Sequence, residues 1–407
     1  MQQKKNMKKI NKICEVCDQK KQVEFLNLGK QPLCDDLIRV NSNKINKKYE
    51  TKLSFCKECF TVHQLKQVNK KVLFPKNYHY RARFTQDVLD GMRDLTKKIN
   101  THVNKKRTVL DIGCNDGSLL NEFKKKGFKT IGVEPTGAAK DAQKKHKVIN
   151  DYFSKETSKI VKKKFGIPSV IVFTNVFAHI SNLNQLLQNL KILFEKDTII
   201  VIENHYLGSV IDQFQFDTFY HEHPRTYSLK SFKFISKKLG GKIFKVEFPK
   251  RYSGNIRVYI KHKENFLIKE NKINYNKENY FFKSISDFQK KLNKWKIFKK
   301  KQLIKLKIKH GILYGKAFPG RASIIINFLG LNTNFFDATF EKPGSLKNGH
   351  YIPGTRIKIV SEKFLKKIRN KKILINFAWH IQKEIKMYLK KKGYNFKIIN
   401  IFNKNEI

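Results

Sequence analysis

The sequence predicts an α/β protein: a small cysteine-paired module followed by two domains in which strands alternate with helices. Two C-x-x-C pairs within residues 13–66 indicate the module. From Thr108 onward, short apolar runs alternate with amphipathic stretches, which is typical of an open, mostly parallel sheet. A second strand, glycine turn and helix at Ile312–Leu331 predicts a smaller α/β domain at the end of the chain.

The charge balance is the first constraint on function. The chain has 407 residues, enough for two or three domains, and a formal net charge of +53. Such a charge is common in nucleic-acid-binding proteins, which usually gather it on one face and use arginine for base edges. Here lysines are spread through every segment. We therefore expect solvated basic faces that attract anionic substrates, and no nucleic-acid partner.

Membrane and secretory signals are missing from the sequence. No stretch approaches ~18 consecutive apolar residues, so we expect no membrane insertion. The first 14 residues are basic but lack the apolar core of a signal peptide. With four of six cysteines in C-x-x-C pairs, a reducing compartment with a metal site fits better than a disulfide framework. The expected location is cytoplasmic, and no oligomeric state is specified.

The paired cysteines predict a zinc site. Cys14 and Cys17 form one pair and Cys56 and Cys59 the other, with 38 residues between them. Four thiolates make a closed tetrahedral Zn²⁺ site, whose role is structural because no position stays open. A redox C-x-x-C would instead need one pair in a thioredoxin-like pattern, which is missing. The remaining candidates, Cys34 and His63, are not expected to ligate.

The stretch Val109–Glu134 predicts a ligand-binding turn. An apolar strand ends in the turn D-x-G-x-N-D-G, a helix begins at Ser118, and a second strand ends on Glu134, 21 residues after Gly113. Glycines let the backbone approach a ligand closely, and an acidic residue after the second strand can accept both hydrogens of a ribose diol. Because the turn is acidic, it suits a cation better than a pyrophosphate. S-adenosylmethionine, a sulfonium with a ribose, is the ligand we expect.

Two aromatic and histidine-rich segments flank this turn. The connector Phe74–Thr85, which leads into a helix over Gln86–Asn104, carries tyrosines and arginines that could cover a cofactor, hold a phosphate or simply pack. Farther along, the segment FDTFYHEH at 216–223 follows the fifth strand of the predicted sheet. Its tyrosine, glutamate and two histidines could supply a proton acceptor and donors to an oxyanion. A surface turn is the alternative, and no spacing there indicates a metal.

The domain that contains the glycine turn is expected to extend through a series of strands and helices. We expect helices at Ala138–Lys145, Lys155–Lys164, Leu183–Phe194 and Ser231–Leu239, and strands at Lys147–Asn150, Ser169–Phe173, Thr198–Glu203, Ile243–Phe248 and Asn255–His262. Glu203 and His179 then fall at or just after carboxyl ends of strands, where ligands of such sheets bind.

The last third of the chain predicts a linking helix and a second turn. Residues 264–310 are lysine-rich with helical apolar spacing, and a basic helix that binds a nucleic acid or a membrane surface is the less favoured alternative. In the turn at 315–321, Lys316 and Arg321 lie beside the amides of a helix start, a combination that can hold an anion. The turn lacks the G-K-[ST] ending of a P-loop, so ATP hydrolysis is not supported.

Together these blocks resemble the sugar C-methyltransferases that act on nucleotide-diphosphate-linked 4-keto-deoxysugars. The resemblance runs from Cys14 to about Ile385. The most specific motifs are the cysteine pairs, LDIGCNDGSLL, NVFAHI, FDTFYHEH, SGNIRVYI, YGKAFPGRAS, HYIPGT and AWHIQKEI. The family implies a zinc-binding module (1–70), a Rossmann-like class I methyltransferase domain (71–263), a linking helix (264–310) and a smaller C-terminal Rossmann-like domain (311–407) that binds substrate.

The resemblance also implies roles for individual residues. His223 would remove the proton from the sugar carbon next to the ketone, and the resulting enolate would attack the methyl group. Tyr220, Glu222 and His179 would orient the sugar and stabilise the enolate, and Tyr78 or Tyr80 would close over the site. The residues implied to contact S-adenosylmethionine are Asp111, Gly113, Asn115, Gly117, Glu134, Asp151 and Asn175, and those implied to hold the diphosphate are Lys316 and Arg321.

The expected activity is thus S-adenosylmethionine-dependent C-methylation of a nucleotide-linked 4-keto-deoxysugar, in polysaccharide or secondary-metabolite assembly. One alternative is a methyltransferase of the same fold that acts on oxygen or nitrogen of a sugar-like acceptor. Such a reaction forms no carbanion and would not need His223 as a base. The other alternative is a basic RNA-binding methyltransferase, which would lose RNA affinity steeply with salt.

Overall fold

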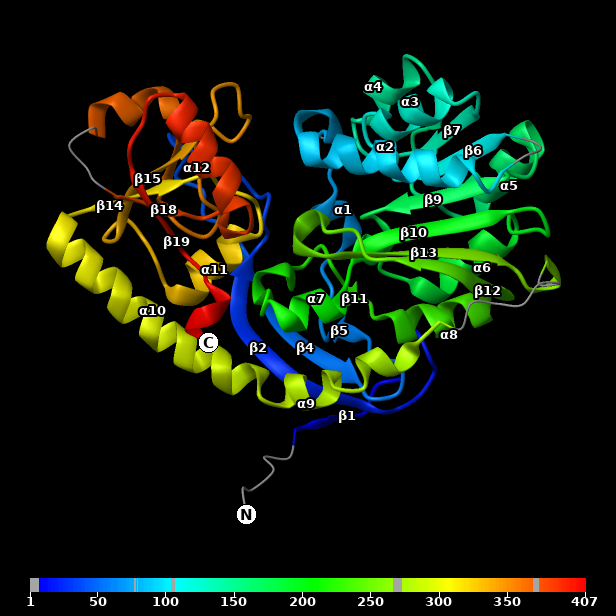
Figure 1. Ribbon diagram of the computed structural model, residues 1–407, viewed down its shortest axis with the longest axis horizontal. Coiled ribbons are helices and arrows are strands. Elements are labelled where there is room, and N and C mark those ends of the chain that lie inside the picture. Colours follow the sequence, from blue (N-terminus) through cyan, green and yellow to red (C-terminus); the bar gives the residue numbers. More distant parts are fainter. Residues whose placement is uncertain (1–6, 77, 79, 104–106, 266–272, 369–372) are drawn as a thin grey trace.

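The computed structural model describes residues 7–76, 78, 80–103, 107–265, 273–368 and 373–407. Its strands form three sheets of five, seven and seven strands. In Figure 1 the C-terminal lobe lies at left, the middle domain at right, and the long N-terminal strands β2 and β4 run beneath and between them. No helix in the described ranges is long and apolar enough to cross a membrane.

The N-terminal sheet is antiparallel and is completed by a strand from the middle domain. Its order is β1-β2-β4-β5-β11. The strands are β1 (Lys9–Ile10), β2 (Gln22–Pro32), β4 (Lys48–Cys56), β5 (Val62–Gln64) and β11 (Arg225–Thr226), and a short helix, α1 (Lys70–Leu73), follows. Because β11 pairs with β5 two residues after His223, the cysteine module is fixed directly to the predicted histidine segment.

The middle domain has the strand order β8-β7-β6-β9-β10-β13-β12. Six of these strands run in the same direction, and β13 alone is antiparallel to its neighbours β10 and β12. The strands are β6 (Thr108–Ile112), β7 (Lys129–Val133), β8 (Lys147–Ile149), β9 (Val170–Thr174), β10 (Ile199–His205), β12 (Gly241–Glu247) and β13 (Asn255–His262). The helices are α2 (Gln86–Asn100), α3 (Ser118–Lys125), α4 (Ala139–Gln143), α5 (Lys155–Phe165), α6 (Leu183–Lys191), α7 (Leu207–Asp212) and α8 (Leu229–Leu239).

Alternating side chains on the middle strands build two apolar layers. On one face Leu110 and Ile112 pack in a cluster with residues of α5, α6 and α8. On the other, Val109 packs in a cluster with α2 and α3. A parallel sheet covered on both faces leaves only its edges accessible, and its carboxyl edge carries the predicted site residues.

The C-terminal sheet has the order β19-β18-β14-β15-β17-β16-β3. Its strands are β14 (Leu313–Lys316), β15 (Phe336–Glu341), β16 (His350–Tyr351), β17 (Lys358–Ser361), β18 (Ile373–Asn376) and β19 (Lys397–Asn400), with helices α11 (Ala322–Leu329) and α12 (Gln382–Lys391). The edge strand β3 (Ile38–Arg39) comes from the N-terminal part and pairs with β16. The chain between β2 and β3 therefore spans from the cysteine module to the C-terminal lobe.

The linking segment is helical over only part of the predicted range. Helix is present at α9 (Phe281–Ser286) and α10 (Phe288–His310), preceded by a 3-10 turn at Tyr275–Glu278. Residues 266–272 of the predicted helix lie outside the described residues. One side of α10 buries Phe288, Leu292 and Trp295 in the core that joins the N-terminal and C-terminal sheets.

Candidate active site

The four paired cysteines form a metal-binding group. The sulfur atoms of Cys14, Cys17, Cys56 and Cys59 all lie within 4.8 Å of one another, and all four residues are buried. The Cys14–Cys59 and Cys17–Cys56 sulfur pairs are each 3.5 Å apart. Tetrahedral Zn²⁺ with bonds of about 2.3 Å separates its sulfur ligands by about 3.8 Å, which lies within the range of these separations, so the donor set fits zinc.

Polar groups around the cysteines hold the sulfur atoms and fasten the module. His63 Nε2 lies 3.2 Å from Cys14 Sγ, and burial lowers the pKa of His63 to about 3, so the neutral ring can donate to a thiolate. Ser228 and Ser231, which cap α8, donate to the Cys59 carbonyl at 3.1 Å each. Neither His63 nor Cys34 belongs to the metal-binding group.

A cavity of about 850 Å³ lies at the carboxyl edge of the middle sheet and is lined by all three parts of the chain. Most predicted site residues line it: Tyr78, Tyr80, Asp111, Gly113, Asn115, Glu134, Asn175, His179, Tyr220, Glu222, His223 and Arg321. Gly117, Asp151 and Lys316 do not. The structure therefore brings the glycine turn, the histidine segment and part of the second turn to one space.

The turn after β6 lines the cavity at the carboxyl end of that strand. Gly113 has a φ of +76°, and an added Cβ would lie 2.6 Å from Val176, so backbone and not side chain faces the space. Asp111 is 2 % exposed, and its Oδ1 has no hydrogen-bond partner among the described residues. Burial, and then repulsion from Glu134, raises the pKa of Asp111 to about 8. An unpartnered buried carboxyl group suits a cationic ligand.

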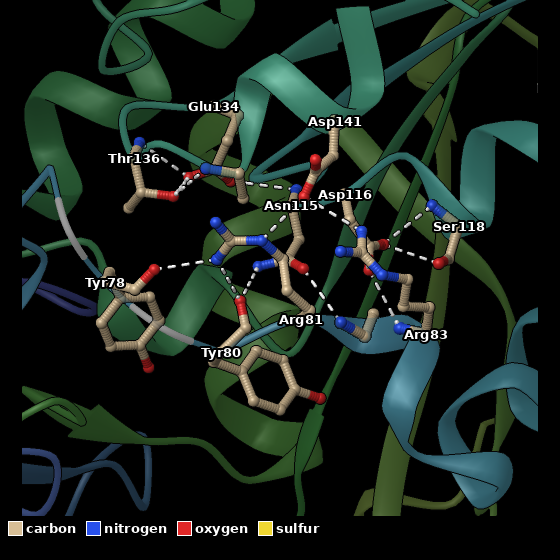
Figure 2. A network of polar contacts seen from close by, with 12 residues as sticks. Tyr78, Tyr80, Arg81, Arg83, Asn115, Asp116, Ser118, Glu134, Thr136 and Asp141 are labelled. Atoms are coloured by element: carbon tan, nitrogen blue, oxygen red, sulfur yellow. Dashed lines mark hydrogen bonds and ion pairs between the residues drawn. The ribbon is translucent and has the colours of Figure 1, made fainter. Parts of the chain in front are cut away.

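The connector residues Tyr80, Arg81, Ala82 and Arg83 make polar contacts with this turn and with Asp141 (Figure 2). Asn115 accepts a hydrogen bond from the Ala82 amide at 3.0 Å and donates to the Tyr80 carbonyl at 3.2 Å. Arg81 and Arg83 both pair with Asp141 at 2.9 and 3.0 Å. The arginines are thus held by a carboxylate beside the glycine turn, and the connector lines one side of the cavity.

Glu134 is largely satisfied by the chain itself. Its carboxylate accepts from the Asn115 amide at 3.0 Å and from the amide and hydroxyl of Thr136 at 2.9 and 2.5 Å. With about four acceptor positions on a carboxylate, roughly one remains for a further donor. Asp151 is exposed and accepts from the Tyr152 amide at 2.7 Å, while Tyr152 and Phe153 line the cavity instead.

Two asparagine side chains and a buried glutamate lie at or just after the carboxyl ends of β9 and β10. Asn175 adopts a φ of 56° and accepts a hydrogen bond from Asn255 at 3.3 Å. Glu203 accepts hydrogen bonds from Asn255, Arg251 and Arg257 at 2.9, 3.2 and 2.7 Å, so it is an internal anchor. Asn204, which lines the cavity, has no hydrogen-bond partner for either side-chain polar atom among the described residues.

The histidine segment places an imidazole with a free basic nitrogen in the cavity. His223 Nδ1 lies 3.0 Å from the Thr218 carbonyl oxygen, an acceptor, so Nδ1 carries the hydrogen and Nε2 keeps its lone pair. The His223 ring lies 4.3 Å from that of Tyr220 and 4.9 Å from that of His179. Burial, and then the neighbouring His179 and His205, lower the pKa of His223 well below its usual value, so the ring is neutral near pH 7.

In the second glycine turn, both predicted cations already have carboxylate partners. Lys316 is 3 % exposed and its ammonium lies 2.7 Å from Glu362, outside the cavity. Arg321 forms a bidentate pair with Asp217 at 2.6 and 2.8 Å, and the Trp379 indole donates to the same carboxylate at 2.9 Å. The Asp217 contacts join the C-terminal lobe to the middle domain. A bound anion would have to compete with Glu362 for Lys316.

Several lining residues were absent from the sequence prediction. Those that line the cavity include Asp35, Tyr152, Phe153, Asn204, His205, Arg251, Lys342, Lys347 and His380. Asn204 and His205 come directly after the predicted strand Thr198–Glu203. Their position at a strand end could therefore have marked them as candidate site residues. Asp35, Lys342 and Lys347 lie in loops without a motif, and only the tertiary fold brings them to the cavity.

Three family models match consecutive parts of the chain. A putative zinc binding domain matches residues 14–74, a methyltransferase domain matches 79–245, and a C-methyltransferase C-terminal domain matches 251–397. The C-methyltransferase NovU from Streptomyces niveus is 24 % identical over 253 residues. That match spans 60 % of this chain and 60 % of the length of NovU.

Two solved structures that match part of the chain are methyltransferases. A SAM-dependent methyltransferase from Archaeoglobus fulgidus is 21 % identical, with 49 % of this chain and 87 % of that chain covered and a TM-score of 0.34. A magnesium protoporphyrin IX methyltransferase from Synechocystis with bound SAH is 12 % identical, with 44 % and 84 % covered and a TM-score of 0.34.

The sheet topology, the family matches and the site geometry agree on two bound groups. The middle domain matches a methyltransferase domain and binds S-adenosylmethionine. The four buried cysteines belong to the matched zinc-binding domain and hold a structural zinc ion.

Proposed function

The chain has the three-domain architecture of the C-methyltransferases, and from that premise we propose that it transfers a methyl group to carbon in a nucleotide-linked 4-keto-deoxysugar. The observation that carries the proposal is a neutral imidazole, His223, whose free Nε2 shares one cavity with the methyl-donor turn. Carbon is a nucleophile only after it loses a proton, so C-methylation needs such a base, whereas many oxygen acceptors do not.

His223 is placed to take the proton. Its Nδ1–H is fixed by the Thr218 carbonyl, which sets the ring orientation and leaves Nε2 to accept the hydrogen of the carbon next to the ketone. His179 is held in the same way, with Nδ1 2.6 Å from the Glu222 carbonyl. S-adenosylmethionine supplies an electrophilic methyl group to the enolate carbon, and the proton remains on His223 until it exchanges with water.

The enolate oxygen requires hydrogen-bond donors, and the residues around His223 can supply them. Burial raises the pKa of Tyr220 well above 10, so its hydroxyl stays protonated and can donate. Burial also raises the pKa of Tyr78, which lines the same cavity. Donors fixed before the reaction stabilise an oxyanion more than water does, because they need no reorganisation.

The nucleotide end of the substrate is expected along the C-terminal loop 341–347. Lys342 and Lys347 line the cavity there, and Lys347 donates to the Phe318 carbonyl at 2.8 Å. Neither ammonium has an ion pair with a carboxylate among the described residues, in contrast to Lys316 and Arg321. We therefore place the diphosphate nearer Lys342 and Lys347, with Arg321 retaining Asp217.

The test is an assay with S-adenosylmethionine labelled in its methyl group and a panel of nucleotide-linked 4-keto-deoxysugars. Mass spectrometry and NMR of the product should locate the label on the carbon next to the ketone. The same sugars should exchange that carbon's hydrogen with deuterated water without methyl donor, because His223 acts before transfer. Label on oxygen or nitrogen, or transfer without such an acidic carbon, would refute the proposal.

A further inference from the structure

The linking helix α10 carries apolar side chains on its outer side as well as on its core side. The residues of α10 that are buried against the core are Phe288, Leu292, Trp295, Lys299 and Leu303. On the opposite side, Ile297, Ile304 and Ile308 are 60, 43 and 80 % exposed. Steps of seven and four residues place these three side chains in one row along the helix, here called the isoleucine row. A surface helix normally has polar residues at such positions.

This apolar exposure is concentrated on α10. In the described part of the chain, no other α-helix exposes more than one large apolar side chain. Single exposed apolar residues are common on protein surfaces, whereas a contiguous group of them indicates a contact surface. Figure 1 shows α10 along the outer edge of the molecule, between the C-terminal lobe and the N-terminal strands. Helix α10, which is described in full, contributes no residue to the active-site cavity.

Lysine side chains surround the isoleucine row. Helix α10 contains ten lysines and no aspartate or glutamate. With about 3.6 residues per turn, Lys301 lies in the row itself, and Lys294 and Lys305 lie next to it. The ion pair that α10 makes among the described residues joins the buried Lys299 to Glu406 at 2.7 Å. The exposed lysines, which have no such partner there, are Lys290, Lys291, Lys294, Lys301, Lys305 and Lys309.

We propose that the outer side of α10 docks on a lipid surface that contains anionic headgroups. The isoleucines enter the boundary between headgroups and acyl chains, and the lysine ammonium groups reach the headgroup phosphates while the methylene stems stay in apolar surroundings. The helix lies on the surface and does not cross it. This inference goes beyond the proposed methyl transfer and does not depend on it.

The combination of charge and apolar surface favours lipid over other partners. A nucleic acid would use the lysines but leave the isoleucines in water, and α10 has no arginine to read base edges. A second copy of the chain would bring the same lysines against each other, because a two-fold contact joins identical patches. Anionic headgroups neutralise the lysines while the acyl boundary receives the isoleucines, so one partner suits both parts of the surface.

Co-sedimentation of the full, zinc-loaded chain with lipid vesicles tests the proposal. The vesicles consist of phosphatidylcholine alone or of phosphatidylcholine mixed with phosphatidylglycerol. We expect binding to the anionic vesicles, weakened by salt, and little binding to the neutral ones. The triple variant Lys294→Gln, Lys301→Gln, Lys305→Gln should bind about 100-fold more weakly, because each lysine near such a surface contributes a factor of about five. Replacing all three isoleucines of the row by serine should weaken binding at least about tenfold.

Helix α5 provides the matched control. Its exposed Lys155, Lys159 and Lys163 are replaced by glutamine, which lowers the net charge by the same amount. Figure 1 shows α5 on the opposite side of the molecule from α10. This variant should bind vesicles within about twofold of wild type, because charges beyond a Debye length are screened. Equal losses in the two lysine variants would mean that overall charge alone causes adsorption, and this result would overturn the proposal. Wild-type binding by the serine variant would overturn it as well.

Tryptophan fluorescence reports whether the row enters the lipid. The emission of an Ile308→Trp variant should shift to the blue with anionic vesicles, whereas that of Ile160→Trp, on α5, should not. Methylation in solution should be unchanged in all α10 variants, because α10 does not line the cavity, and circular dichroism verifies that each is folded. If the α10 variants lose RNA affinity but keep vesicle binding, or if the serine variant dissociates an oligomer without lipid, the surface serves another partner and the proposal fails.

Discussion

The two glycine turns of this chain share the pattern of strand, turn and helix but have different roles. The first, between β6 and α3, leaves Asp111 Oδ1 without a partner and faces the cavity with backbone at Gly113. The second, between β14 and α11, has its charges neutralised: Lys316 by Glu362 and Arg321 by Asp217. The first turn can therefore receive a charged ligand, whereas the second stabilises a lobe and its junction with the middle domain.

The difference shows that the pattern of strand, glycine turn and helix determines the backbone conformation but does not determine which ligand binds. Whether the charged groups of such a turn are available depends on partners that come from elsewhere in the sequence. Glu362 lies 46 residues from Lys316, and Asp217 lies 104 residues from Arg321. The following experiments test this contrast, beginning with the largest expected effect.

Replacing His223 by alanine should reduce C-methylation by about 10²- to 10⁴-fold, the usual contribution of a general base. A loss of this size would show that methyl transfer takes place in the cavity beside the first turn. Affinity for S-adenosylmethionine, measured by calorimetry, should remain close to wild type, because His223 is not part of the donor floor. Solvent exchange at the acidic carbon should fall in parallel with kcat. Transfer that persists near the wild-type rate would exclude a carbanion mechanism.

Replacing Lys316 by methionine should lower the free energy of unfolding by about 3 kcal/mol, because Glu362 becomes a buried carboxylate that has lost its ion-pair partner. Urea unfolding measures this loss. The double variant Lys316→Met, Glu362→Leu should recover most of it, since the unpaired charge is gone. Donor affinity should not change in either protein. A stable Lys316→Met protein that binds nucleotide sugar poorly would instead make Lys316 a ligand.

Replacing Gly113 by alanine should cost more stability than replacing Gly127, although both have nearly the same positive φ, +76° and +79°. An added Cβ at Gly127 meets nothing within 4 Å, so about 1 kcal/mol of backbone strain is expected. At Gly113 it meets Val176 at 2.6 Å, which adds about 1–3 kcal/mol of overpacking. Urea unfolding gives both values, and calorimetry should show weakened donor binding for Gly113→Ala alone.

Replacing Asp111 by asparagine should weaken binding of S-adenosylmethionine by about tenfold above pH 8, where the wild-type carboxylate is charged. The raised pKa of Asp111, about 8, means that the group becomes neutral as the pH falls below that value. The wild-type advantage should therefore shrink between pH 8 and pH 6. Because both proteins face the same titrating donor, the ratio of their dissociation constants isolates Asp111. A ratio that is constant with pH would contradict this assignment.

Much of the architecture follows from local pattern. The apolar runs at 108–112, 129–133 and 170–174 alternate with amphipathic helices, so β6, β7 and β9 and their helices were predictable. The cysteine spacing predicted the metal group, because the identity and number of thiolates nearly determine the metal. His223 was indicated by its segment, but its free Nε2 depends on the Thr218 carbonyl, which only the folded loop brings within 3.0 Å.

The features that could not be predicted from the sequence depend on contacts between residues far apart in the chain. Nothing around Asp35 distinguishes it from other loop aspartates, and its place in the cavity follows from strands that pair in two different sheets. Lys316 and Arg321 resemble an anion site locally, but their carboxylate partners cannot be inferred from spacing. Asp151 follows β8, which ends at Ile149, but its carboxylate accepts a hydrogen bond from the next amide, and Tyr152 and Phe153 line the cavity instead.

The pairing of β3 with β16 has a consequence for how the protein is made. Tyr351, the partner of Ile38, leaves the ribosome 313 residues after it. At typical rates of synthesis this interval is roughly 15 to 60 s. During that time the edge of the nascent N-terminal hairpin, and the aspartate beside it, have no C-terminal lobe to join. Chaperone protection of this early segment should therefore matter more than for a chain whose domains close in order.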